Sequence, residues 1–411
     1  MTKSPRCDIL KTDREKIQLT GETTMLNEKG QRELAYVVKI DAICPIEGAD
    51  RVEVAKVGGW RIMVHKGQFV PGDLAIYFEI DAKVPEREPF LFLEPKHYKI
   101  KTQKYFKGTV ISQGLLMSAE DFGWERESLQ LGDFLTTKLG VTYAIEEDNA
   151  RKSPGMDPYK KMARRHPKLF QVAAVKWLYQ RNWGKKLLFV LFGKKKDKKS
   201  AWPSWVTRTD EERVQNIPCV LEDKSEWIAT EKIDGTSTTA TLRKTGRRKY
   251  QFYICSRNVV FDKPGRKLYY DFNVYTEMAE KYHFEETLKN IADKYGLEWV
   301  TLQGETYGAG VQKRDYSLKE HDFMGFNLIF SGRGRLGSKE SADIMREYGI
   351  PWVPILDENF ILPDTVEELL QIATGKSVVD GGMREGLVLR SRDGSKSFKA
   401  VSNEYLLKYH G

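Results

Sequence analysis

A Lys-x-Asp-Gly cluster at residues 232–235 is the feature that most constrains the fold and the chemistry of this chain. The flanking residues, 227–229 and 238–242, are β-prone, which predicts two strands joined by a loop that carries Lys232. Gly235 permits a tight backbone in such a loop. Lys232 becomes a nucleophile if burial or a nearby cation lowers its pKa from the ordinary value of about 10.4. A solvated Lys and Asp at a hairpin turn is the alternative interpretation.

Further short stretches follow this cluster in a fixed order. They lie at or near strand-like runs and comprise residues 254–258, 302–308, 322–327, 385–390 and 397–403. In this order they resemble the motifs of the covalent nucleotidyltransferases, the superfamily that contains ATP-dependent ligases and RNA capping enzymes. The resemblance covers residues 220–408, and five ordered matches do not readily arise by chance.

The resemblance implies an enzyme that transfers a nucleotide in three steps. Lys232 attacks the α-phosphorus of ATP, forms a lysyl–AMP phosphoramide and releases pyrophosphate. AMP then moves to the 5′-phosphate of a polynucleotide, and a 3′-hydroxyl attacks that activated phosphate while AMP leaves. The covalent intermediate divides one difficult transfer into easier steps.

The resemblance also implies a divalent cation, because negative charge develops at the α-phosphate during the reaction. Mg²⁺, with Mn²⁺ as an alternative, prefers oxygen ligands and keeps several of its waters. Asp234, Glu305 and Glu385 are the expected carboxylates, acting through water, and Glu305 is also a candidate ribose ligand. A solvated Glu at a strand end is the alternative for the two glutamates.

Four more side chains complete the nucleotide site that the family implies. Lys399 is expected to contact the α-phosphate and to help keep the nucleophilic lysine deprotonated, while Arg257 binds the ribose or a phosphate. Phe326 is expected to stack on adenine, and Glu231 to read the adenine edge. Plain surface charge is the alternative for Arg257, and a plain core position is the alternative for Phe326.

Lys399 is preferred over other lysines near the C-terminus because of its place in a predicted hairpin. A turn at residues 393–394 puts it on a strand that returns opposite the strand of Glu385. Two positions depart from the family pattern. Val401 stands where many relatives carry a second lysine, and Asn327 stands where aspartate is common, so the local contacts there can differ.

Ahead of these motifs, β-rich stretches predict a small β-barrel. Gly58 and Gly59 form a turn between two of its strands. Residues 45–74 resemble the N-terminal OB domain of one RNA ligase family, so an OB-type barrel is preferred over another small β-domain. The expected strands are residues 34–40, 52–57, 60–64, 73–80 and 110–116.

Helices are expected between the motif-bearing strands, at residues 285–295, 339–348 and 365–373. For the last helix, Asp364 and Glu367 form a capping-box pattern. The predicted fold class is α+β, with an OB-like β-barrel followed by a nucleotidyltransferase domain of antiparallel sheets flanked by helices. The predicted parts are an N-terminal extension, the barrel, a basic insertion and an adenylyltransferase domain, at residues 1–32, 33–148, 149–202 and 203–411.

The net charge of +9 is concentrated in residues 151–200. This segment holds 16 Lys and Arg against two acids, a local charge of +14 that leaves −5 for the rest of the chain. We expect the segment to contact the phosphate backbone of nucleic acid. A solvated insert and an interfacial amphipathic helix are the alternatives. The segment looks like an insertion relative to the family, so the resemblance assigns it no role.

Composition favours a soluble globular protein in a reducing intracellular compartment, cytoplasmic or nuclear, and a monomer is expected. No apolar run approaches the roughly 20 residues of a membrane span, and the first residues lack the apolar core of a secretory signal. The four cysteines are scattered without Cys-x-x-Cys spacing, which argues against a zinc site or a disulfide framework.

Within the superfamily, the order of domains favours an RNA ligase. The OB-like domain comes first and no further domain follows Lys399, which resembles the ATP-dependent RNA ligases that seal nicks with a 3′-hydroxyl RNA end. RNA or an RNA-containing nicked duplex is therefore the expected partner. A GTP-dependent capping-type guanylyltransferase is one alternative. A non-catalytic RNA-binding protein on a ligase fold is another, disfavoured because Lys232 and the three carboxylates are intact.

Overall fold

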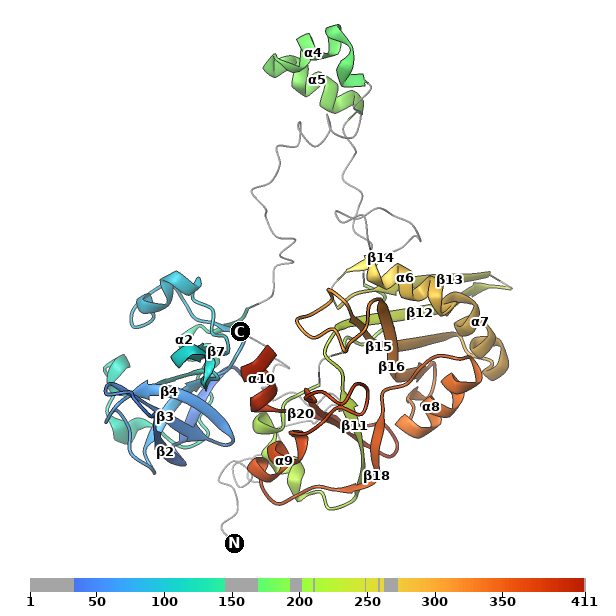
Figure 1. Ribbon diagram of the computed structural model, residues 1–411. Helices are drawn as coiled ribbons and strands as arrows, with labels where there is room; N and C mark the ends of the chain where they lie inside the picture. Colours follow the sequence, from blue (N-terminus) through green and yellow to red (C-terminus); the bar gives the residue numbers. More distant parts are fainter. Residues whose placement is uncertain are drawn as a thin grey trace. The chain divides into compact units, whose positions relative to one another are not determined.

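The computed structural model describes residues 33–144, 169–192, 202–209, 211–247, 249–257, 259–261 and 273–409 (Figure 1). It divides into two compact units. One unit comprises Met1–Ile145 together with Ser204–Gly411, and the other is Glu146–Pro203. The expected N-terminal extension, residues 1–32, lies outside the described residues.

The N-terminal part of the first unit is a domain of short antiparallel strands. Two three-stranded sheets, ordered β1-β5-β9 and β2-β3-β4, enclose apolar cores that include Trp60, Tyr77 and Phe78. The strands are β1 (Ala35–Lys39), β2 (Ala42–Pro45), β3 (Val52–Val57), β4 (Trp60–His65), β5 (Leu74–Phe78), β6 (Ala82–Lys83), β7 (Gln103–Tyr105), β8 (Val110–Ser112), β9 (Leu115–Met117) and β10 (Thr142–Tyr143). The helices are η1 (Leu91–Lys96), η2 (Phe106–Gly108), η3 (Glu120–Phe122), η4 (Arg126–Ser128) and α2 (Thr136–Leu139).

The expected hairpin between β3 and β4 is confirmed, with Val57 paired to Trp60 across Gly58 and Gly59. Both glycines have positive φ, 51° and 84°, a conformation that other residues adopt at a cost. The single strand expected at residues 110–116 is wrong. The backbone breaks there into β8 and β9, because Gly114 has a φ of 101° and passes too close to the Tyr77 ring for a Cβ.

The C-terminal part of the first unit contains a six-stranded antiparallel sheet, ordered β14-β13-β12-β15-β16-β17. Three helices cover one of its faces, and their apolar side chains share one core with those of the sheet (Figure 1). The strands are β12 (Thr236–Gly246), β13 (Lys249–Cys255), β14 (Val260–Phe261), β15 (Trp299–Gly308), β16 (His321–Phe330) and β17 (Gly334–Arg335). The helices are α6 (Val274–Lys281), α7 (Phe284–Tyr295) and α8 (Ser338–Glu347), which confirms the two helices expected in this region.

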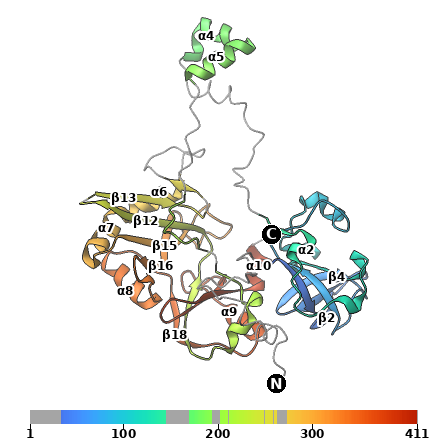
Figure 2. The same ribbon diagram turned by 180° about the vertical axis from the view of Figure 1, so that it is seen from behind.

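The C-terminal part also contains a four-stranded sheet, ordered β18-β11-β19-β20. Its strand β11 precedes the six-stranded sheet in the sequence, and its other three strands follow that sheet. Helix α9 packs on the four-stranded sheet, burying Leu369 against Trp227 and Phe398 (Figure 2). The strands are β11 (Glu226–Lys232), β18 (Ile355–Ile361), β19 (Gly386–Ser391) and β20 (Ser397–Val401). The helices are η6 (Val214–Asn216), η7 (Pro218–Glu222), α9 (Val366–Ala373) and α10 (Asn403–Tyr409).

The described portion of the second unit is a small helical hairpin. It consists of η5 (Leu169–Gln171), α4 (Ala173–Tyr179) and α5 (Asn182–Phe192). The rest of the basic segment, residues 151–168 and 193–200, lies outside the described residues. Among the helices of the described ranges, none combines the length and apolar character needed to cross a membrane.

The cap of α9 differs from the expected one by one residue. The Thr365 hydroxyl accepts a hydrogen bond from the Glu368 N–H at 3.2 Å, and the Glu368 carboxylate accepts one from the Thr365 N–H. Asp364 instead accepts a hydrogen bond from the Lys224 ammonium at 2.8 Å. The local sequence contains two overlapping capping-box patterns, Asp364 with Glu367 and Thr365 with Glu368. The structure uses the second pattern, and Asp364 pairs with the distant Lys224 instead.

Replacing the observed cap should therefore cost more than replacing the expected one. Thr365→Ala should lower the free energy of unfolding by about 1 kcal/mol, because an N–H at the helix start loses its acceptor. Asp364→Ala removes only an exposed ion pair and should cost a few tenths of a kcal/mol. Thermal unfolding of the two variants measures the difference, and an equal or larger loss in Asp364→Ala would contradict the assigned cap.

Candidate active site

Lys232 is the last residue of β11, so the expectation that it lies on the following loop is wrong. It pairs with Gly386 of β19, and a connection of three residues leads from it to β12. This connection joins the four-stranded sheet to the six-stranded sheet. Gly235 is needed there for close approach, since a Cβ would clash with the backbone oxygen of Thr306.

The Lys232 ammonium donates a hydrogen bond to Glu385 Oε2 at 2.8 Å. The lysine side chain is 24% exposed and the glutamate 8%, so the pair is largely shielded from water. Burial alone would lower the pKa of Lys232, but Glu385, Glu305 and Asp234 outweigh it and raise the pKa above its ordinary value. The sequence analysis expected the surroundings to lower the pKa of Lys232. That expectation is wrong, because three carboxylates lie close to the ammonium and raise its pKa.

Glu305, on β15, has a strongly perturbed carboxyl. Burial, together with the nearby charges of Glu385 and Asp234, raises its pKa to about 8 against the opposing effects of Lys232 and Arg257. The structure thus brings together all three carboxylates predicted for the metal and the predicted nucleophile.

Two tyrosines that the sequence analysis missed hold Asp234 in place. The Tyr405 hydroxyl, on α10, donates to Asp234 Oδ2 at 2.7 Å, and the Asp234 N–H donates to the Tyr316 oxygen at 2.7 Å. Burial and the charge of Asp234 raise the pKa of Tyr405, so its phenol stays protonated and keeps donating. The Arg314 guanidinium lies 3.9 Å from the Tyr316 ring and pairs with Asp380.

Lys399 lies on β20 as expected. It pairs with Val388 of β19, which pairs with Thr230 of β11. Residues opposite one another in a sheet, or two apart along a strand, share a face. Lys399 and Lys232 therefore lie on the same face of the four-stranded sheet, the face away from the core under α9.

A buried arginine on that face is a second feature that the sequence analysis missed. Arg390 donates to the Thr230 hydroxyl at 3.1 Å, and its guanidinium lies 5.8 Å from the ring of Phe326. Burial lowers the pKa of Arg390 to about 10, although Glu211 opposes the change. A charged residue at the end of an apolar run was the available signal.

Phe326, on β16, is half-buried and packs against a cluster that includes Ile233. It therefore borders the connection that follows Lys232, as a stacking platform would, and it also has the apolar contacts of a core residue. Asn327 is buried and donates to Gln303 at 3.1 Å. At this departure from the family pattern, the amide thus makes a neutral hydrogen bond inside the sheet.

Glu231 is 1% exposed, and its Oε2 accepts a hydrogen bond from the Val378 N–H at 2.9 Å. Its other oxygen, Oε1, is buried without a hydrogen-bond partner. A buried, unpaired carboxylate oxygen is costly, so a ligand that supplies an N–H donor would be stabilised here. This atom is the clearest indication that a polar ligand edge belongs beside β11.

Arg257 is exposed and follows β13. Its charge is close enough to lower the pKa of Glu305, so it lies on the carboxylate side of the site. Val401, which replaces the second lysine of many relatives, is 2% exposed and packs with Ile111 and Leu406. A lysine at that position would bury its charge among apolar side chains, which explains the departure.

No group of three or more His, Cys, Asp or Glu side chains within the described ranges is arranged to ligate a metal ion directly. Asp234 and Glu385 nevertheless lie near enough to Glu305 to raise its pKa. Oxygen donors in such an arrangement fit a hydrated Mg²⁺ or Mn²⁺ rather than a dehydrated ion.

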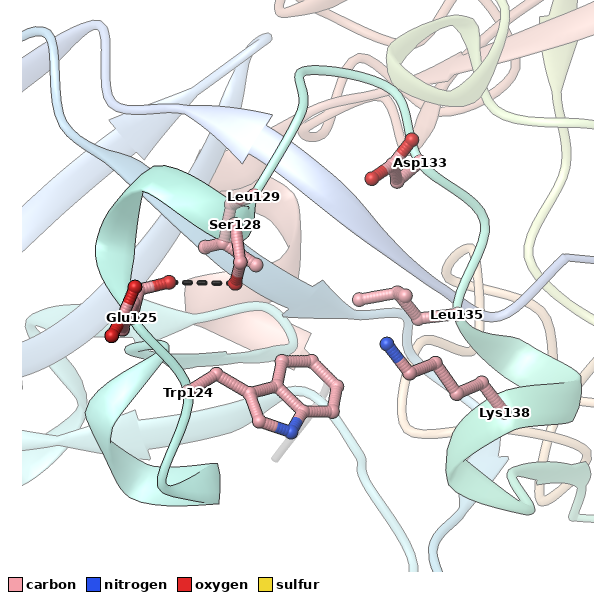
Figure 3. A pocket seen from close by; sticks show the side chains of 7 residues that line it. All are labelled: Trp124, Glu125, Ser128, Leu129, Asp133, Leu135 and Lys138. Atoms are coloured by element: carbon pink, nitrogen blue, oxygen red, sulfur yellow. Dashed lines mark hydrogen bonds between the residues drawn. The ribbon is translucent and has the colours of Figure 1, made fainter.

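A hollow of about 340 Å³ lies away from these residues, in the N-terminal domain (Figure 3). Trp124 forms part of its wall, but the Lys138 ammonium lies 4.1 Å from the centre of the indole and the Phe122 ring stacks at 5.1 Å. The indole is thus already in contact with two side chains. Besides Trp124 and Lys138, the lining residues are Glu125, Ser128, Leu129, Asp133 and Leu135.

The raised pKa of Glu305 predicts a stability that depends on pH. A carboxyl whose folded pKa is raised stabilises the fold fully below the unfolded pKa, and loses that contribution as pH rises through the folded value of about 8. The wild-type protein should therefore lose this contribution between pH 5 and pH 9, and Glu305→Gln, which has no such carboxyl, should not. The stability of Glu305→Gln relative to the wild type should increase as the pH rises from 5 to 9. Each unit of pKa shift corresponds to about 1.4 kcal/mol, so a gain of at least about 1 kcal/mol is expected.

Thermal unfolding at the two pH values measures this gain. Glu298→Gln is the matched control, because Glu298 is 62% exposed and lies just before the same strand. Its stability relative to the unchanged protein should stay constant with pH. A constant difference for Glu305→Gln as well would show that the carboxyl is not held in its protonated form.

Comparison with known proteins finds a family match for each of the two parts of the first unit. A family model described as RNA ligase matches residues 225–410, and an OB-fold domain model matches residues 34–119. No curated protein matches the chain.

Solved structures of an RNA ligase from Naegleria gruberi resemble most of the chain. A Lys-to-Met mutant with AMP and Mn is 27% identical, with a TM-score of 0.64, covering 92% of this chain and 99% of that one. A Glu-to-Ala mutant with ATP and Mn is 26% identical, with a TM-score of 0.63 and coverages of 92% and 100%. The same ligase with PPi is 28% identical, with a TM-score of 0.62 and coverages of 92% and 99%.

The expected OB-type domain and α+β nucleotidyltransferase fold are therefore confirmed. The motif order, the domain order and the fold agree with one another. Residues 225–410 thus match the RNA ligase family, and an OB-fold domain precedes them in the chain.

Proposed function

We propose that this RNA ligase uses ATP and a divalent cation to join a 3′-hydroxyl RNA end to a 5′-phosphate end, at nicks in duplexes. The observation that carries the proposal is the Lys232–Glu385 pair, with Asp234 and Glu305 beside it. Attack on a nucleotide phosphate needs a primary amine, and the carboxylates beside this one would hold the divalent cation that offsets the negative charge of the phosphate. The reaction proceeds through lysyl–AMP and then through an adenylated 5′-phosphate.

Attack by Lys232 on the α-phosphorus requires the unprotonated amine. The ammonium first loses one proton, and Glu385, which accepts a hydrogen bond from Nζ at 2.8 Å, is the group placed to receive it. The Nζ–P bond then forms, the bond from the α-phosphorus to pyrophosphate breaks, and the nitrogen loses a second proton to solvent. Bound Mg²⁺ or Mn²⁺ would supply positive charge that offsets the charge developing on the α-phosphate and weakens the hold of the carboxylates on the proton.

The nucleotide would lie over the face of the four-stranded sheet that carries Lys232 and Lys399. Glu231 Oε1, buried and without a partner, would accept a hydrogen bond from the amine of adenine. Phe326 would stack on the base, and Arg257 would bind the ribose or a phosphate. Lys399 would contact the α-phosphate, where its charge opposes the charge that develops.

The proposal also includes the domain bounds, the oligomeric state and the cellular location. We take residues 33–148 and 203–411 as the OB and adenylyltransferase domains of a monomer, and a reducing compartment, cytoplasmic or nuclear, as its location. For residues 149–202, nucleic-acid contact stays a prediction, weighed below against another ligand.

Incubation with radiolabelled ATP or GTP, followed by a denaturing gel, tests the proposal. ATP should transfer label to the protein, and GTP should not. Label from GTP would favour a capping-type guanylyltransferase, and no label from either nucleotide would favour a binding protein on a ligase fold. Sealing of a nicked duplex with an RNA 3′ end, and not of one with a DNA 3′ end, tests the proposed substrate.

Lys232→Ala should abolish the labelled adduct while the protein stays folded, because no other amine occupies the end of β11. Lys232→Arg should not restore it, since a guanidinium is not deprotonated in proteins. Lys396→Ala is the matched control, because that lysine is exposed on the same domain and pairs with Asp223. An adduct of undiminished yield in Lys232→Ala would remove this residue from the proposal.

Replacing Asp234, Glu305 or Glu385 by Ala should each lower the rate of adduct formation at least about 100-fold, because preorganised charge contributes on that scale. Raised Mg²⁺ or Mn²⁺ should restore part of the rate. The control is Glu404→Ala, an exposed acid on α10 beside Tyr405. Unchanged labelling of the wild-type protein in excess chelator would contradict the role of a metal.

A further inference from the structure

An exposed apolar row runs along α5 in the second unit. Trp183, Leu187 and Leu191 are 55%, 44% and 63% exposed, and they follow one another at intervals of four residues. Side chains at this spacing lie on one face of a helix. Large apolar side chains grouped in this way on a surface indicate an interaction site.

This row is not the face that holds the hairpin together. Leu188 is 2% exposed and lies inside, and Gly184 packs so closely on α4 that a Cβ would clash with the backbone of Leu178. The rings of Phe170 and Tyr179 meet at 5.2 Å. The hairpin thus has its own small core, and the exposed row is available for a partner outside it.

The apolar surface continues onto α4. Trp177 is 49% exposed and meets Trp183 edge to face at 6.3 Å. The Arg181 guanidinium lies 3.6 Å from the centre of the Trp177 ring. A basic group therefore borders the aromatic pair directly.

The charge of this unit selects an anionic partner. Residues 169–192 include Lys176, Arg181, Lys185 and Lys186 and no acid, within a segment whose net charge is +14. The remainder of the chain is negative, so the positive charge is confined to the unit that carries the exposed row. Nucleic acid and anionic lipid both match this charge.

The leucines distinguish the two ligands. Leu187 and Leu191 have neither charge nor an aromatic face, so a phosphate backbone or an unstacked base gives them little to bind. A lipid surface buries them, and it also places tryptophan at the level of the headgroups. Helix α5, with 11 residues, is about 16 Å long and too short to cross a hydrocarbon core of about 30 Å, so it would lie in the interface.

We infer that the α4–α5 hairpin docks this RNA ligase onto an anionic lipid surface. The apolar row of α5 enters the boundary between headgroups and acyl chains, while the lysines and Arg181 contact lipid phosphates. This inference does not depend on the proposed nucleotide chemistry, which concerns the other unit.

Co-sedimentation of the full-length protein with vesicles tests the inference. The protein should sediment with vesicles of phosphatidylcholine and phosphatidylserine and stay in solution with phosphatidylcholine alone. Leu187→Asn combined with Leu191→Asn keeps the charge and should weaken binding about tenfold or more, because the buried apolar area is lost. Ile361→Asn, which changes an apolar residue of β18 that is 51% exposed, is the matched control and should bind like the wild type.

A second variant, Lys185→Gln with Lys186→Gln, leaves the apolar row intact and should weaken binding by a similar factor at low salt. Both variants should keep the circular-dichroism spectrum and unfolding temperature of the wild type, which shows that they are folded. Absence of wild-type binding to anionic vesicles, or full binding by the Asn variant, would overturn the inference. If instead both variants lose affinity for nicked RNA, and the wild type ignores vesicles, the hairpin is a nucleic-acid contact.

Discussion

The ion pair between Lys232 and Glu385 is the interaction on which the rest of the site depends. Both side chains are largely shielded from water, and a buried charge is tolerated only with a close partner of opposite sign. The pair joins the end of β11 to the residue just before β19, two strands that are neighbours in the four-stranded sheet. From this end the chain turns into β12 of the six-stranded sheet, so the site forms where the two sheets meet.

The carboxylates of this region outnumber the single ammonium of Lys232 beside them. Asp234 and Glu305 add two more carboxylates. The carboxylates raise the pKa of Lys232, and burial, with a smaller contribution from the neighbouring carboxylates, raises that of Glu305. The hydroxyl of Tyr405 fixes Asp234 from α10, the last helix of the described chain. The site is thus poised to lose a proton when further positive charge arrives, and it holds that proton until then.

Local sequence predicted several of the strands, the helices α7, α8 and α9, and the charged residues that the structure brings together, because these follow from periodicity and short motifs. It failed where the answer depends on distant residues. Lys232 was expected to have a lowered pKa, and the opposite holds because Glu305 and Glu385 arrive from 73 and 153 positions further along the chain. Tyr405 carries no motif, and only the packing of α10 brings it to Asp234. At α9, two overlapping capping patterns were equivalent locally; in the structure Thr365 makes the cap and Asp364 pairs with Lys224.

The central claim is that Lys232 itself carries the nucleotide. Peptide mapping by mass spectrometry, after the protein has been incubated with ATP and Mg²⁺, tests it most directly. We expect an added adenylate on the peptide that contains Lys232, and loss of that adduct in mild acid, as a phosphoramide requires. An adenylate found on a peptide that contains Lys399 instead, or on a peptide from the second unit, would contradict the account.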